Sequence, residues 1–226
     1  MRILLAHHFP FDASVDGQCT RQLARALVSA GHQVHAIIVD RQADGTDCIP
    51  VRRIVCREQQ TASDDLPFDV PCFATQPISP QTFETLSDAH LAEYRAALRQ
   101  AFDEEVHGFD PHLIHAQHVW VMGQLALETG VPYVLTAWGP ELLSYAEDTR
   151  YRGLADQAAE NAGAVFIAHS SLQASLASTF DGAIGRTVLL PLPVEQVRQD
   201  DAMRDAARQM GITYVEVYEN RCGRRP

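Results

Sequence analysis

Residues 1–39, MRILLAHHFPFDASVDGQCTRQLARALVSAGHQVHAIIV, contain the pattern that decides the fold. The run Arg2-Ile3-Leu4-Leu5-Ala6 is apolar after its first residue, which is typical of a strand buried on both faces of a parallel sheet. Residues 20–30 carry apolar side chains at helical spacing, and Gly31 follows them as a stop signal. Because a second apolar run covers residues 34–39, the stretch predicts one strand–helix–strand unit.

The rest of the chain continues this alternation. Further strands are predicted at 51–55, 113–116, 133–136, 164–168, 187–190 and 215–218. Further helices are predicted at 80–106, 120–128, 141–146, 154–161, 171–178 and about 199–210. Residues 57–81 carry four prolines and no clear period, so an irregular loop is expected there. Such alternation indicates an α/β fold with a Rossmann-like, doubly wound parallel sheet.

Composition and charge exclude several functional classes. The chain has 226 residues, of which 46% are hydrophobic, as in an ordinary globular protein. Its formal net charge of -11 provides no overall field that would attract nucleic acid. The five cysteines include no closely spaced pair, so reduced thiols are expected. The first apolar run is too short for a signal peptide or a membrane span, so we expect a cytoplasmic protein without a transmembrane segment.

The loops that follow the strands are the candidate sites, because open parallel sheets bind ligands beyond the carboxyl ends of their strands. The side chains singled out in four such loops are Asp16 and Gly17, His115 and His118, Trp138, Gly139 and Glu141, and Ser170. At a helix start, the backbone amides around Gly17 can approach a phosphate or a sugar hydroxyl. An ordinary helix-opening turn is the alternative, since neither a G-x-G-x-x-G motif nor a P-loop is present.

His112, His115 and His118 are spaced three apart, which raises a metal hypothesis. A strand followed by a loop does not bring such residues to one side, and no carboxylate or cysteine lies close in sequence. We therefore expect no metal, and interpret these histidines as a polar lining or as half-buried structural residues. Trp138 and Glu141 suit sugar binding through an aromatic face and a carboxylate, with an ordinary helix start as the alternative.

Four stretches, taken in order, resemble the N-terminal domain of family-four GT-B glycosyltransferases, which are retaining nucleotide-sugar enzymes. They are residues 1–39, FDPHLIHAQHVWVMGQLALETGVPYVLTAWGPELL, AGAVFIAHSSLQASLAS and TVLLPLPVE. The resemblance implies one half of a GT-B architecture over residues 1–195. Residues 196–226 are then expected to form a linker helix and a short stub of a missing C-terminal domain.

The resemblance also implies roles for the loop residues. Asp16 and Gly17 would face the phosphates of a nucleotide-sugar donor substrate, without any cofactor. A hydroxylated acceptor would bind in a cleft lined by His115, His118, Trp138, Gly139, Glu141 and Ser170. No residue is assigned as catalytic; Ser170 itself resembles a helix N-cap more than a nucleophile, because no G-x-S-x-G motif surrounds it.

Three features depart from the family pattern. Asp16 replaces the first glycine of a pair, and its charge would repel a diphosphate unless it faces elsewhere. Trp138 replaces a histidine, and Pro191-Leu192-Pro193 replaces the usual asparagine and glycine. The donor-binding half is missing, so we expect no sugar transfer without a separate donor-binding domain or subunit. Two alternatives stay open: a non-catalytic sugar- or nucleotide-binding module that acts with a partner protein, and an epimerase or other nucleotide-sugar enzyme.

Overall fold

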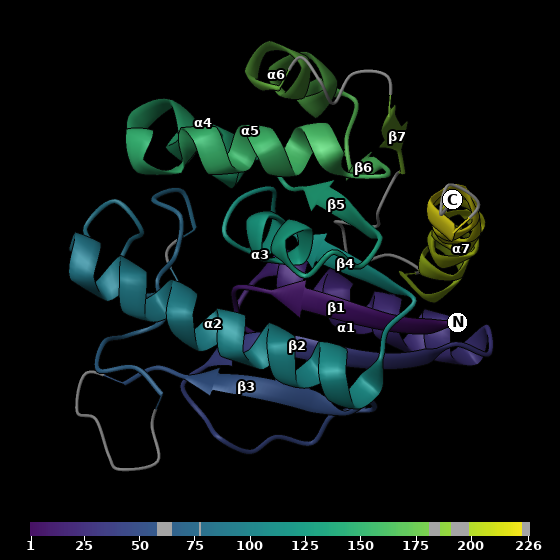
Figure 1. Cartoon of the computed structure of the whole chain (residues 1–226), viewed down its shortest axis with the longest axis horizontal. Helices are drawn as coiled ribbons and strands as arrows, with labels where there is room; N and C mark the ends of the chain where they lie inside the picture. The colour runs from purple at the N-terminus through teal and green to yellow at the C-terminus, as the bar shows by residue number, and fades with distance from the viewer. Residues whose placement is uncertain (58–64, 77, 181–185, 191–198, 223–226) are drawn as a thin grey trace.

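The computed structural model describes residues 1–57, 65–76, 78–180, 186–190 and 199–222 (Figure 1). It contains one seven-stranded sheet in the order β3-β2-β1-β4-β5-β6-β7, and every neighbouring pair is parallel. The strands are β1 (Arg2–His7), β2 (Gln33–Asp40), β3 (Val51–Val55), β4 (Leu113–Gln117), β5 (Tyr133–Ala137), β6 (Val165–Ile167) and β7 (Thr187–Leu189). The predicted Rossmann-like, doubly wound sheet is therefore confirmed, with its switch of direction between β1 and β4.

Helices cover both faces of the sheet. They are α1 (Val15–Ser29), α2 (Asp88–Phe109), α3 (Met122–Glu128), α4 (Pro140–Glu147), α5 (Arg152–Asn161), α6 (Ser171–Thr179) and α7 (Gln199–Cys222), with a 3-10 turn η1 (Thr149–Tyr151). Apolar residues of α2, α3 and α5 fill the core on one face, and those of α1 and α7 fill it on the other. Figure 1 shows α2 and α3 in front of the strands and α1 behind them. Within the described residues, no helix has the length and apolar character needed to cross a membrane.

Capping residues move two helix starts away from the predicted positions. α1 begins at Val15, five residues early, because the Ser14 hydroxyl accepts a hydrogen bond from the Gly17 amide. α2 begins at Asp88, eight residues late, where Ser87 caps the His90 amide. In both cases the apolar spacing alone does not locate the helix start.

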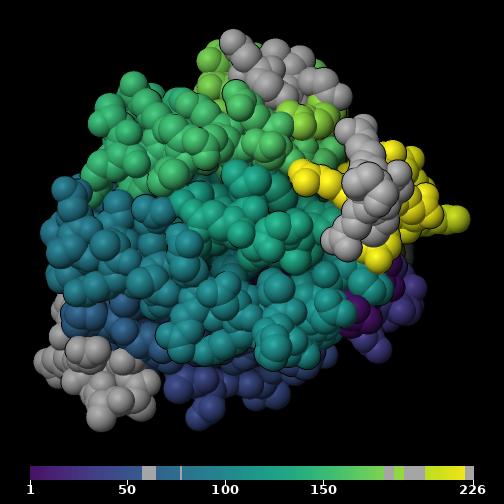
Figure 2. All heavy atoms as spheres, in the orientation of Figure 1, coloured from purple at the N-terminus to yellow at the C-terminus, as the bar shows by residue number. Residues whose placement is uncertain are grey.

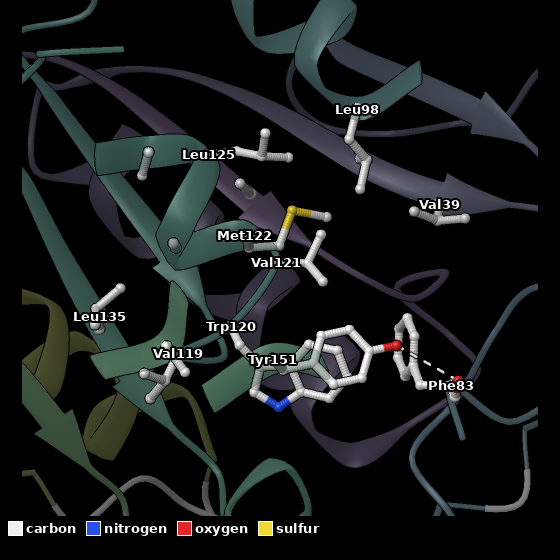
Figure 3. Packing of buried hydrophobic residues seen from close by; sticks show 14 of the residues in the cluster. Val39, Phe83, Leu98, Val119, Trp120, Val121, Met122, Leu125, Leu135 and Tyr151 are labelled. Atoms are coloured by element: carbon white, nitrogen blue, oxygen red, sulfur yellow. Dashed lines mark hydrogen bonds between the residues drawn. The ribbon is translucent and has the colours of Figure 1, made fainter. Parts of the chain in front are cut away.

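The segment between β3 and α2 contains only isolated bridges in its described part, as expected of an irregular loop. It is nevertheless a core segment, since Phe73 and Phe83 are fully buried. Trp120 lies against Tyr151 with ring centroids 3.6 Å apart, and the Tyr151 hydroxyl donates to the carbonyl of Phe83 (Figure 3). This packing closes the segment over the carboxyl ends of the strands.

The strand predicted at 215–218 is wrong, because these residues lie within α7. The buried side chains of α7 are Met203, Ala206, Ala207, Met210, Thr213, Tyr214 and Val217. Their spacing of three and four residues is that of a helix with one face on a core. α7 packs against α1 and the sheet, while the boundary at residue 195 stays a prediction. The third departure from the family pattern, Pro191-Leu192-Pro193, lies outside the described residues.

Candidate functional site

Three loops that follow β1, β4 and β5 meet at the carboxyl edge of the sheet. They bring together Asp16 from the first turn of α1, His118 from the end of β4, and Glu141 from the first turn of α4. His118 Nε2 lies 3.0 Å from Asp16 Oδ2, and His118 Nδ1 lies 3.4 Å from Glu141 Oε2. All three side chains are buried, with exposed fractions of 0–2%. We call these three residues the Asp16–His118–Glu141 triad.

His118 is the central member of the triad. Its backbone has φ of 81°, in the left-handed region, and its amide donates to the carbonyl of Thr136 on β5. Burial by itself would lower the pKa of His118, but the carboxylates of Glu141 and Asp16 raise it to about 9. His118 is therefore an imidazolium near neutral pH, with one carboxylate on each side.

Asp16 faces the interior of the protein. Its Oδ2 accepts hydrogen bonds from His118 and from the Gln76 side-chain amide at 3.1 Å. Burial would raise the pKa of Asp16, but the hydrogen bond with His118 and the nearby His7 hold it well below its usual range. The inward orientation matters for the predicted donor site, because this carboxylate does not point from the loop into solvent, where it would repel a diphosphate.

Glu141 uses both carboxylate oxygens within the protein. Oε1 accepts from the amide of Trp138 at 2.8 Å, and Oε2 accepts from the amide of Gly139 at 2.9 Å. The carboxylate thus lies in the first turn of α4, where a negative charge is favoured, and accepts from the amides that precede the helix. Position 139 favours glycine, because the backbone φ there is +112°. Glu141 fixes the Trp138–Gly139 turn, and its burial leaves no exposed surface for a sugar.

His7 and His8 complete the cluster and were not predicted as site residues. His7 Nδ1 accepts from the amide of Phe9, and its Nε2 lies 3.8 Å from Asp16 Oδ2. His8 is bonded to the Tyr94 hydroxyl at 2.7 Å and to the Trp120 carbonyl at 3.1 Å. Burial lowers the pKa of His7 to about 4 and that of His8 well below its usual value, so both are neutral.

His7, Asp16 and His118 are also the described residues that offer metal-ligand atoms within 4.8 Å of one another. The hydrogen bonds favour a network without metal. Because the Phe9 amide occupies Nδ1 of His7, the proton of neutral His7 lies on Nε2, which is the atom that would bind a metal. His112, His115 and His118 do not converge, since His112 accepts a hydrogen bond from the Arg2 amide and His115 faces α7.

Two other predicted residues have structural contacts. His115 is fully buried, and its ring nitrogens are bonded to the Tyr214 hydroxyl at 2.6 Å and the Thr136 hydroxyl at 2.7 Å. It therefore ties β4 to α7 inside the core. Gly17 is buried too, and a Cβ there would lie 2.7 Å from the carbonyl of Pro10, which only glycine avoids.

The remaining predicted residues lie at or near the surface. Trp138 is partly buried, and its indole Nε1 donates to Gln117 Oε1 at 3.1 Å. Ser170 is exposed and makes no capping hydrogen bond with its side chain. Gly139 is partly exposed and lies beside Leu172 of α6. The triad is thus buried, whereas Trp138, Gly139 and Ser170 are at least partly exposed.

Comparisons with known proteins agree with this architecture. The sequence matches the family described as glycosyl transferase 4-like domain over residues 17–193. No curated protein matches the sequence significantly.

Among solved structures, the chain is similar to sucrose-phosphate synthase from Thermosynechococcus elongatus, with a TM-score of 0.60 and 18% identity over 96% of this chain and 99% of that one. A longer chain of the same synthase has a TM-score of 0.57 and 19% identity over 84% of this chain and 48% of that one. A UDP-GlcNAc 2-epimerase from Methanocaldococcus jannaschii has a TM-score of 0.52 and 9% identity over 84% of this chain and 45% of that one.

At identities this low, the structural similarity shows the fold alone, which is that of one half of a GT-B architecture. The chain spans about half the length of the two longer structures. The family match covers most of the sequence and includes His118, Glu141 and the Trp138–Gly139 turn, whereas Asp16 lies one residue before the matched range. The chain belongs to the glycosyl transferase 4-like domain family.

Proposed function

We propose that the chain supplies the acceptor-binding half of a sugar transfer from a nucleotide-sugar. The observation that carries this proposal is the Trp138–Gly139 turn at the carboxyl edge of the sheet. Trp138 is partly exposed there and also packs against the core, while Glu141 accepts a hydrogen bond from its amide and Gln117 accepts one from its indole nitrogen. A rigidly held aromatic face with nearby polar groups suits a hydroxylated ligand such as a sugar.

We also propose that transfer needs a separate donor-binding domain or subunit. The amide of Gly17, which the sequence suggested for donor phosphates, already donates to the Ser14 hydroxyl. Residues 9–20 around it contain no lysine or arginine that could neutralise a phosphate. Both features weaken this loop as a phosphate site, so the cations that neutralise a diphosphate would have to come from another domain.

We also propose that the protein is located in the cytoplasm. Among the cysteines whose side chains the structure describes, Cys48, Cys56 and Cys72 are free thiols. Free thiols are typical of reducing compartments, which supports a cytoplasmic location.

Calorimetric titration and a transfer assay test the proposal together. We expect a panel of mono- and disaccharides to include a ligand whose affinity falls about tenfold, or about 1.4 kcal/mol, in W138A. V28A is the matched control, because Val28 is an exposed apolar residue on α1. Unchanged affinity in W138A would remove the acceptor site from this turn.

Incubation of the purified chain with nucleotide-sugars and the same saccharides should give no transfer. Transfer by the chain alone would refute the need for a donor-binding partner. Binding of a nucleotide-sugar or nucleotide with no saccharide binding would instead favour the non-catalytic module acting with a partner protein.

A further inference from the structure

The loop after β6 carries an exposed histidine, His169. It follows the last residue of β6, Ile167, by two positions, just as Gly139 follows the last residue of β5, Ala137. β5 and β6 are parallel neighbours, and Ala137 is paired with Ile167. Because adjacent strands lie about 4.8 Å apart, His169 comes next to the Trp138–Gly139 turn at the carboxyl edge of the sheet.

The start of α6 packs against the same turn. A Cβ at Gly139 would lie only 3.0 Å from Cδ2 of Leu172, which is the second residue of α6. α4, which begins at the turn, also contacts α6. Figure 2 shows the residues of α4, α5 and α6, in green, along one rim of the molecule. The loop of His169 is therefore a direct neighbour of the proposed acceptor site.

The imidazole of His169 is held by the first residue of α6. Its Nδ1 accepts a hydrogen bond from the Ser171 amide at 3.2 Å and lies 2.8 Å from Ser171 Oγ. Because a backbone amide can only donate, Nδ1 carries no proton, and the Ser171 hydroxyl donates to it as well. The N–H of the ring is therefore on Nε2. Within the described part of the chain, Nε2 has no hydrogen-bond partner.

His169 takes over the capping of α6 from the residue that usually provides it. Ser170 occupies the N-cap position, where a serine hydroxyl commonly accepts from an amide of the first turn, but its side chain makes no such bond. The ring of His169 accepts from the Ser171 amide instead. A donor whose ring is already fixed loses little conformational freedom on binding, and fixed polar groups beside an aromatic ring are typical of ligand sites.

We propose that His169 is a second acceptor-binding residue, whose Nε2 donates a hydrogen bond to a hydroxyl of a saccharide that packs against Trp138. This role rests on the proposed function of the Trp138–Gly139 turn, and it adds a contact that selects among sugars. Apolar packing separates sugars that differ in one hydroxyl poorly, whereas a donor that loses its partner discriminates strongly.

Two substitutions separate ligand binding from helix capping. In H169N the side-chain oxygen can take the place of Nδ1 and cap the Ser171 amide, but the Nε2 donor is lost. In H169Q the side-chain amide can extend to the place of Nε2, but the cap is lost. H169N should therefore keep the wild-type melting temperature and bind the sugar about fivefold more weakly, whereas H169Q should melt lower and bind more tightly than H169N. A capping role alone predicts the opposite order of affinities, which would overturn the proposal.

Calorimetric titrations with D-glucose, D-mannose, D-galactose and maltose measure these affinities. H107N, which alters an exposed histidine in the last turn of α2, is the control and should bind like the wild type. One monodeoxy form of the bound sugar should lose about fivefold in affinity for the wild type and nothing for H169N.

The two proposals fail in different ways. Wild-type affinity in H169N, together with weaker binding in W138A, would overturn the role of His169 and leave the site at Trp138 intact. A wild-type chain that binds none of these sugars would refute the proposed function and the role of His169 with it.

Discussion

Asp16→Asn removes one carboxylate from the triad and keeps the shape of the side chain. In the wild-type protein, His118 is an imidazolium because Glu141 and Asp16 outweigh the effect of its burial. Removal of the Asp16 charge therefore lowers the pKa of His118 and withdraws the strongest partner of its Nε2. Loss of one partner from a buried charge pair is among the changes that destabilise a protein most.

The size of the loss in unfolding free energy follows from the pKa of His118. Its value of about 9 lies above the 6.5 of an unperturbed histidine. At 1.36 kcal/mol per pH unit, this difference corresponds to about 3 kcal/mol of stabilisation, which Glu141 and Asp16 share. We expect Asp16→Asn to cost about 2 kcal/mol at pH 7, or roughly 4–8 °C in Tm for a domain of this size.

The cost should depend on pH in one direction. A group whose pKa is raised on folding stabilises the protein fully below its unfolded pKa of 6.5, and this contribution is lost as pH rises through about 9. Urea unfolding at pH 6.5, 7.5 and 9.5 should therefore show a cost of Asp16→Asn that shrinks with pH. The control is Asp103→Asn on the exposed side of α2, with a cost below about 0.5 kcal/mol. Equal losses of unfolding free energy in both variants, or a loss in Asp16→Asn that does not change with pH, would show that His118 is not an imidazolium in the folded protein.

Three further predictions concern stability. Gly17→Ala should lower the free energy of unfolding by about 1–3 kcal/mol, because the new Cβ meets a loop carbonyl. Gly108→Ala has open space around the new Cβ within α2 and should raise the free energy of unfolding by about 0.5–1 kcal/mol. Thermal melts of both variants compare the two effects. The free energy of unfolding should fall by about 1.4 kcal/mol per pH unit for each of His7 and His115 as pH drops below 6.5. Burial keeps their pKa values near 4 and 3 in the folded protein, whereas the same histidines take up protons in the unfolded chain. Urea titrations at pH 7, 5.5 and 4.5 measure this slope. Tyr214→Phe leaves the buried His115 Nδ1 without its partner and should cost about 1–3 kcal/mol by urea unfolding, and a cost near zero would contradict the tie between β4 and α7.

The sheet could be predicted from the sequence because its central strands are buried on both faces. Runs such as residues 3–6 and 36–39 are then apolar throughout, and they alternate with segments of helical period. α7 was harder to predict, since Val215 and Val217 resemble part of a strand in a short window. Only contact with α1 and the sheet decides that Val217 faces the core while Val215 faces solvent.

The location of the site was predictable, but the burial of its side chains was not. The rule for parallel sheets selected the loops of Asp16, His118 and Glu141, whose side chains the structure brings together. Applied to the end of β1, the same rule would also have selected His7. Their burial depends on the segment that carries Phe73 and Gln76, which lacks a periodic signal. An inward-facing carboxylate and one in a cleft have the same local sequence, so only tertiary packing separates a supporting residue from a ligand-binding one.

If an acceptor binds at the Trp138–Gly139 turn, the two tryptophan indoles of the chain report it directly. In a ¹H–¹⁵N spectrum, Trp138 Nε1 reports on the carboxyl edge, while Trp120 Nε1 donates to the Glu141 carbonyl in the core and serves as an internal reference. Titration with the saccharide panel should shift the Trp138 indole signal with a saturable curve and leave that of Trp120 in place. A saccharide that binds without moving the Trp138 signal would show that the acceptor does not bind at this turn.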